Sequence, residues 1–117
     1  MTFHVTDPSI APKDVVEVQL YRPHKDHLPN VKVGDAILLQ RPQVKALSKK
    51  GHGLRSGVET AWAVYDEDEG PPQIKGLPVE DWEEYREYMT ELRQWWKAMD
   101  EGTNKKLQEK GKKMMEL

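Results

Sequence analysis

The chain has 117 residues, of which 37% are hydrophobic and 32% are charged, with no cysteine and a formal net charge of −2. This length suits one domain with one modest core, and the lack of cysteine excludes disulfide scaffolds, thiolate zinc sites and cysteine nucleophiles. No apolar run approaches the roughly 18 residues that a membrane-spanning helix needs.

The charge is distributed unevenly along the chain. Residues 1–60 carry nine Lys and Arg against six Asp and Glu, a net +3, and residues 103–117 carry five against two, again +3. Residues 61–102 carry four against twelve, a net −8. A pI of about 6.1 argues against nucleic-acid binding by the whole surface, where basic domains are usual. Charges act over a Debye length of about 10 Å at about 0.1 M salt, so the first half alone could still bind an anion.

The first strand patterns lie before residue 22. Residues 3–6 are short and apolar-rich and end at the turn signal Asp7-Pro8-Ser9. Residues 15–21 form a β-branched run with period two, which Arg22-Pro23 ends. This alternation predicts one apolar face and one polar face, the first with Val16, Val18 and Leu20 and the second with Glu17, Gln19 and Tyr21.

Residues 36–47 predict a longer strand, inside which Pro42 requires a bulge or an edge position. Alternation places Leu38, Val44 and Ala46 on one face and Arg41, Gln43 and Lys45 on the other. Residues 49–53, with Lys49, Lys50 and His52, read as a flexible basic loop. Residues 60–65 predict a further strand that the acidic, Pro-rich run 66–72 ends, and its Trp62 and Tyr65 are expected in the core.

From residue 80 to residue 101 the apolar period becomes helical, which predicts one amphipathic helix. Its expected inner stripe consists of Trp82, Tyr85, Met89, Leu92, Trp96 and Met99. Asp81 and Glu84 form a capping pair in this interpretation, and Gly102 stands at the C′ position. Of the adjacent Trp95 and Trp96, one is expected to face the barrel that the strands form and the other to be partly exposed. The lysine-rich tail 103–117 is either a frayed helical extension or a disordered end.

Short strands with turn signals at regular spacing, followed by a helix, predict a mainly β domain over residues 1–102 with a C-terminal α-helix. We expect an OB-fold-like five-stranded barrel. Only four strands are recognisable, so the first strand of the barrel is missing or is supplied otherwise. That gap leaves a sheet edge open to pairing with another chain.

The order of several motifs carries a resemblance. In sequence, they are Thr6-Asp7, Val18-Gln19-Leu20-Tyr21, Leu28-Pro29, Lys32-Val33-Gly34-Asp35-Ala36-Ile37-Leu38-Leu39, Gln43-Val44-Lys45, Gly51-His52-Gly53-Leu54-Arg55-Ser56 and Thr60-Ala61-Trp62-Ala63-Val64-Tyr65. This order resembles the telomeric single-stranded-DNA-binding OB domain of the protection-of-telomeres/telomere end-binding family. Residues 71–96 are similar to the C-terminal helix of fungal members, and the resemblance covers roughly residues 3–100.

The resemblance implies binding of G-rich telomeric single-stranded DNA, in the nucleus at chromosome ends. It places Tyr21 at a base-stacking position and Arg41 at a groove position, and His52 stands where family members often have Gln. The nucleic-acid-binding residues that we expect are Tyr21, Arg41, Gln43, Lys45, Lys49, Lys50 and His52. Simpler interpretations stay open: Tyr21 could cover a barrel end, the strand residues could blunt a solvated edge, and the loop residues could be merely solvated.

An enzyme is not expected. His24 and His27 are three residues apart without a cysteine or a placed carboxylate, whereas structural zinc normally takes four N or S ligands. No Gly-rich phosphate loop, nucleophile elbow or acid–base carboxylate pair stands out, so we expect no metal and no cofactor. The alternative function is a protein-interaction OB domain of a telomere or other chromosomal complex with little DNA affinity, or a homodimer that completes its barrel by exchanging strands.

Overall fold

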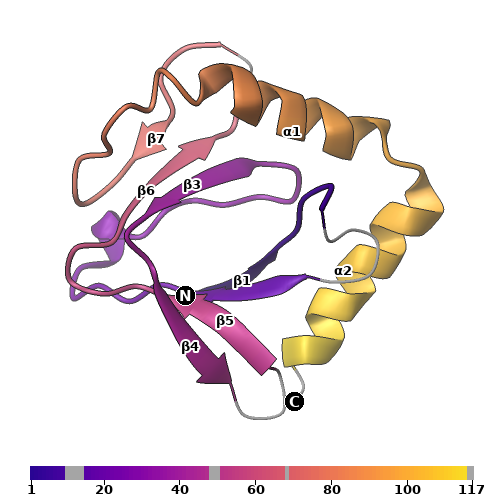
Figure 1. Cartoon of the computed structure of the whole chain (residues 1–117), viewed down its shortest axis with the longest axis horizontal. Helices are drawn as coiled ribbons and strands as arrows, with labels where there is room; N and C mark the ends of the chain where they lie inside the picture. The colour runs from indigo at the N-terminus through magenta and orange to yellow at the C-terminus, as the bar shows by residue number, and fades with distance from the viewer. Residues whose placement is uncertain (10–14, 48–50, 68, 116–117) are drawn as a thin grey trace.

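The computed structural model describes residues 1–9, 15–47, 51–67 and 69–115. In this part of the chain, short strands occupy the first two thirds and two helices the last third (Figure 1). The strands are β1 (Thr2–Val5), β2 (Val16–Gln19), β3 (Ala36–Gln40), β4 (Gln43–Leu47), β5 (Gly51–Arg55), β6 (Ala61–Tyr65) and β7 (Gln73–Ile74). The helices are the 3₁₀ turn η1 (Lys25–His27), α1 (Arg86–Ala98) and α2 (Glu101–Met115). A mainly β domain with C-terminal helix is thereby confirmed.

The strands form two sheets. The first has the order β1-β2-β5-β4 and the second the order β3-β6-β7. All paired strands are antiparallel except β2 and β5, which run parallel. Within the described residues β1 pairs with β2 alone and β3 with β6 alone, so the two sheets do not close into a barrel there.

The predicted single strand over residues 36–47 is wrong, because the chain breaks at Arg41-Pro42. Arg41 has a φ of 57°, in the left-handed region, and Pro42 has no N–H to donate to a ladder. The hydroxyl of Thr60 donates to the Arg41 carbonyl at 2.7 Å and fixes the bend. The break sends β3 and β4 into different sheets, so Val44 does not share a face with Leu38 as predicted and is 69% exposed.

Two apolar clusters lie on opposite faces of the β3-β6-β7 sheet. One fills the space between the sheets around Val18, Leu20 and Trp62, and the other lies beneath α1 around Ala63, Tyr65 and Met89. Trp62 and Tyr65 are almost fully buried, as predicted. The Tyr65 hydroxyl donates to the Trp82 carbonyl at 2.7 Å, and burial raises the pKa of this phenol above its usual value.

The helical region differs from the predicted single helix over residues 80–101. Asp81 has a φ of 57° and accepts a hydrogen bond at its carbonyl from the Glu84 N–H, so it forms a turn instead of a cap, and α1 begins at Arg86. Gly102 lies inside α2 instead of ending a helix. The lysine-rich tail is therefore helical up to Met115, and none of the described helices is long and apolar enough to cross a membrane.

Candidate nucleic-acid interface

The strand register brings polar side chains of three strands together on one face of the β1-β2-β5-β4 sheet. Gln19 of β2 is aligned with Arg55 of β5, and Arg55 is aligned with Gln43 of β4. Aligned residues on adjacent strands point to the same side, so these three side chains share a face, and Lys45 follows Gln43 on it. We name the surface formed by Gln19, Tyr21, Gln43, Lys45 and Arg55 the polar face.

Tyr21 stands at the end of the polar face and is 54% exposed. Its hydroxyl donates to the Gln19 Oε1 at 3.4 Å, and the Arg55 guanidinium lies 5.7 Å from its ring centroid. Its backbone N–H donates to the Ser56 Oγ at 2.8 Å, which fixes the residue beside the end of β5. The aromatic ring is therefore held by a second strand while much of its surface stays open to solvent.

Gln19 and Arg55 form the centre of a hydrogen-bonded row. Arg55 donates to the Gln19 Oε1 from Nη2 at 3.0 Å and from Nε at 3.3 Å. The Gln19 Nε2 in turn donates to the Glu17 Oε2 at 2.8 Å. Because the Gln19 amide binds at both ends, the Arg55 guanidinium is oriented before any ligand arrives.

Glu17 lies on the same strand face as Gln19, as predicted, but its side chain is only 1% exposed. The His4 Nε2 lies 3.4 Å from the Glu17 Oε1, and the ring of His4 is covered by α2 at Gly111. A β-carbon at Gly111 would lie 3.3 Å from three atoms of His4, so any larger residue would require His4 or the helix to shift. The lysine-rich tail thus covers one end of the face.

The remaining predicted residues separate into groups. Gln43 and Lys45 are exposed on the polar face together with Tyr21. Arg41 lies at the break between strands, where its Nη2 is 3.8 Å from the Glu80 Oε1. His52 belongs to β5 and not to a loop, and alternation places it on the opposite face from Arg55. Lys49 and Lys50 lie outside the described residues.

Sequence reasoning missed Gln19 and Arg55 as interface residues. The stretch 51–55 contains two glycines, which favoured a loop and hid a strand. The available signal was the period of two in Gly51, Gly53 and Arg55, because it puts the guanidinium on one face with nothing but glycine before it.

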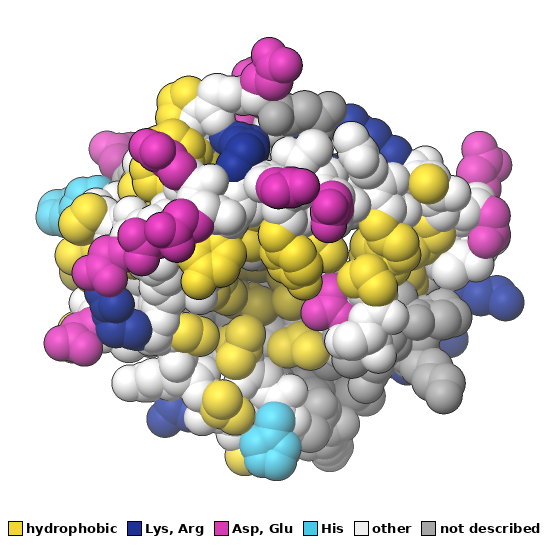
Figure 2. All heavy atoms as spheres, turned by 45° about the horizontal axis from the view of Figure 1, so that its top comes forward, with side chains coloured by type: hydrophobic (Ala, Val, Ile, Leu, Met, Phe, Trp, Pro, Cys, Tyr) yellow, Lys and Arg dark blue, Asp and Glu magenta, His cyan; other side chains and the backbone are white. Residues whose placement is uncertain are grey.

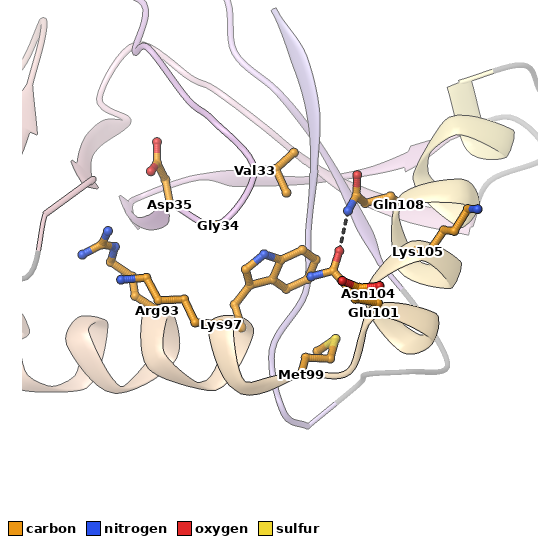
Figure 3. A pocket seen from close by; sticks show the side chains of 11 residues that line it. Val33, Gly34, Asp35, Arg93, Lys97, Met99, Glu101, Asn104, Lys105 and Gln108 are labelled. Atoms are coloured by element: carbon orange, nitrogen blue, oxygen red, sulfur yellow. Dashed lines mark hydrogen bonds between the residues drawn. The ribbon is translucent and has the colours of Figure 1, made fainter.

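A separate hollow of about 640 Å³ lies between the turn at residues 33–35 and the two helices (Figure 3). Gly34 approaches the Trp96 indole there, and Arg93, Lys97 and Lys105 add positive charge against Asp35 and Glu101. Trp95 and Trp96 meet edge to face at 6.4 Å, and both are half-buried. No described residues group three or more His, Asp or Glu side chains in a way that could hold a metal ion.

Comparisons with known proteins agree with a nucleic-acid-binding role for this face. Neither a search of curated proteins nor a search of solved structures gives a match to the chain. One protein family does match, described as "Telomeric single stranded DNA binding POT1/CDC13", over residues 1–106. This match spans most of the chain and includes every residue of the polar face, as well as Arg41 and His52. The chain therefore belongs to the telomeric single-stranded-DNA-binding POT1/CDC13 family.

Proposed function

We propose that the chain binds G-rich telomeric single-stranded DNA through the polar face and acts in telomere end protection. The observation that supports this most is the juxtaposition of an exposed aromatic ring, two amide side chains and two cations across three strands. Single-strand binding needs these components, because bases stack on aromatic rings while cations follow the phosphates. The site works in the nucleus at chromosome ends, and the chain has no enzymatic role.

Each component has a distinct role in the proposal. A base stacks on the open side of the Tyr21 ring, and the Arg55 guanidinium 5.7 Å from the ring centroid strengthens the stack. Lys45 and Arg55 contact phosphates, which positions the strand without reading its sequence. The Gln43 amide offers a donor and an acceptor to base edges, where guanine presents both kinds of partner. The surrounding fold is an OB-type domain over residues 1–102.

The test is a fluorescence-anisotropy titration with labelled G-rich telomeric single-stranded DNA, a scrambled strand of equal length and a duplex, at low and high salt. Preference for the G-rich strand, with affinity that falls as salt rises, is the expected result. Equal affinity for a charge-neutral strand analogue would contradict the phosphate contacts. No binding at micromolar protein would overturn the proposal as a whole.

A second candidate function is a protein-interaction domain of a telomere complex, and the edges of β1 and β3, which pair with no further strand among the described residues, favour it. Phe3 of β1 and Ile37 and Leu39 of β3 pack around the same apolar cluster and stay partly exposed. Figure 2 shows hydrophobic side chains gathered in a hollow on the surface of the molecule. A chain that sediments as a dimer through strand exchange, or pairs with a partner's strand, and ignores DNA would support this function. A monomer that binds DNA would exclude it.

A further inference from the structure

Helix α2 lies against the same side of the sheet as the polar face. His4 of β1 is aligned with Glu17 of β2. His4 comes two residues after Thr2, and Glu17 comes two residues before Gln19, the partner of Thr2. The period of two therefore puts His4 and Glu17 on the side of Gln19, which the hydrogen bond from Gln19 to Glu17 confirms. Since Gly111 covers the His4 ring, the helix occupies the end of the surface on which Tyr21, Arg55 and Lys45 lie.

Few residues hold α2 in place, and the helix carries a net positive charge. Leu107 is 2% exposed, and Gly111 one turn later is buried against His4, so these two residues lie on the inner side of the helix. Asp100 fixes the start of the helix, because its carboxylate accepts from the Thr103 N–H at 2.8 Å and from the Thr103 hydroxyl at 2.7 Å. Within residues 101–115, five lysines stand against two glutamates, a net +3.

We propose that α2 is the basic end wall of the DNA interface, and that a strand which crosses the polar face continues along this helix with its phosphates on the helix lysines. Lys112 and Lys113 adjoin Gly111, the point of contact with His4, and both are exposed. They point about 100° and about 200° away from Gly111 around the helix, so Lys112 stands on one flank and Lys113 on the side away from the sheet. This inference rests on the proposed function and extends it past the family match, which ends at residue 106.

The charge of α2 favours attraction of the DNA strand over competition with it. A segment that blocked a DNA site would be expected to imitate the ligand with negative charge, whereas α2 carries +3 next to cations of the polar face. A single strand bound by Arg55 and Lys45 therefore meets more positive potential as it reaches the helix. The structure assigns α2 to the bound surface by location and by sign of charge.

The first experiment compares two double variants at several salt concentrations with G-rich single-stranded DNA. Lys112→Gln with Lys113→Gln removes two charges beside the seat, and the matched control Lys25→Gln with Lys32→Gln removes two exposed charges elsewhere. Loss of two phosphate contacts lowers the slope of log affinity against log salt by about 1.4. Over a tenfold rise in salt, the affinity of this variant should therefore fall about 25-fold less than that of the unaltered chain. Equal affinities and slopes for the two double variants would overturn the inference.

The second experiment lifts the helix from its seat. Gly111→Leu cannot keep the contact with His4, so α2 is expected to detach while the sheet stays folded, which the amide signals of the strand residues in NMR spectra check. The end wall predicts weaker DNA binding by this variant, whereas unchanged or tighter binding would show α2 to be a bystander or a competitor. Tyr21→Ala run in parallel separates the two proposals. If it weakens DNA binding while the α2 variants do not, only the end wall fails, and if the unaltered chain ignores DNA, both fail.

Discussion

Tyr21 is held in place by partners that leave its ring accessible, which makes it the sharpest single test of the polar face. A base stacked on an aromatic ring contributes about 1–3 kcal/mol, so Tyr21→Ala is expected to weaken single-strand binding by about 5-fold to 150-fold. Tyr88 on α1 is a matched control, because it is 52% exposed and lies away from the face. Equal losses for Tyr21→Ala and Tyr88→Ala in anisotropy titrations would rule out stacking on Tyr21.

Lys45 and Arg41 distinguish a site predicted from the structure from a site predicted from sequence resemblance alone. Lys45 is exposed on the polar face, whereas Arg41 sits at the strand break beside Glu80. We expect Lys45→Gln to lower the salt slope of single-strand binding by about 0.7, the value of one phosphate contact, and Arg41→Gln to change it little. The measurement is the affinity of each variant over a series of salt concentrations. The reverse order would place the strand across the Arg41 bend.

Gly34 shows where the fold requires glycine. Its φ is +97°, and a β-carbon would lie 3.3 Å from the Trp96 Cδ1, whereas Gly70 has a similar φ of +83° with open space around it. The left-handed conformation costs a residue with a β-carbon about 1–2 kcal/mol, so both Gly→Ala variants should lower the free energy of unfolding. Gly34→Ala should lower it further, because Trp96 must also move. Urea denaturation checks this, and equal losses would mean that the indole yields freely.

At the scale of elements, α2 depends on the carboxylate that begins it. The hydrogen bond from the Thr103 N–H, and then that from its hydroxyl, lowers the pKa of Asp100 below its usual value. Because the folded-state pKa is the lower one, the capping stabilisation is complete above the unfolded-state pKa of about 3.9 and is lost as pH falls through the folded-state pKa. Far-UV circular dichroism should show an acid loss of helix in the unaltered chain that is smaller in Asp100→Asn. Identical acid transitions would exclude the cap.

Elements with a clear apolar periodicity were predictable from the sequence. Elements that depend on an unusual backbone conformation or on a contact with a distant segment were not. The strands around Val18 and Val64 and the helix around Met89 follow their apolar patterns. The end of β3 depends on the left-handed Arg41, a conformation that residue type does not announce. Helix α2 has few apolar residues, and its Gly111 lowers helix propensity while it permits the contact with His4.

The candidate site was predictable in part for the same reason. Alternation along one strand found Tyr21, and alternation along the next found Gln43 and Lys45. Which strands are neighbours is a long-range property, so nothing local indicated that β5 inserts between β2 and β4 and contributes Arg55. The burial of Glu17 is also a long-range property, because its partner His4 is covered by a helix that begins more than 80 residues later.

At the scale of the whole molecule, the structure is layered, with α1 on one side of the β3-β6-β7 sheet and the β1-β2-β5-β4 sheet on its other side. The segment 61–102, with its net −8, provides α1 and two strands of the β3-β6-β7 sheet, whereas the polar face belongs to the other sheet. Figure 2, which turns the α1 side toward the viewer, shows acidic side chains gathered there. The net charge of −2 therefore hides two surfaces of opposite sign.

This separation of charge gives the molecule an electric dipole, and the dipole has a kinetic consequence. A protein of small net charge feels little overall force from a polyanion, but a torque turns its basic end forward before contact. Encounters that begin in the right orientation are more productive, so ionic strength acts mainly on the rate of capture, and short-range stacking governs how long the complex lasts. The acidic segment 61–102 thus takes part in recognition from the side that never touches the ligand.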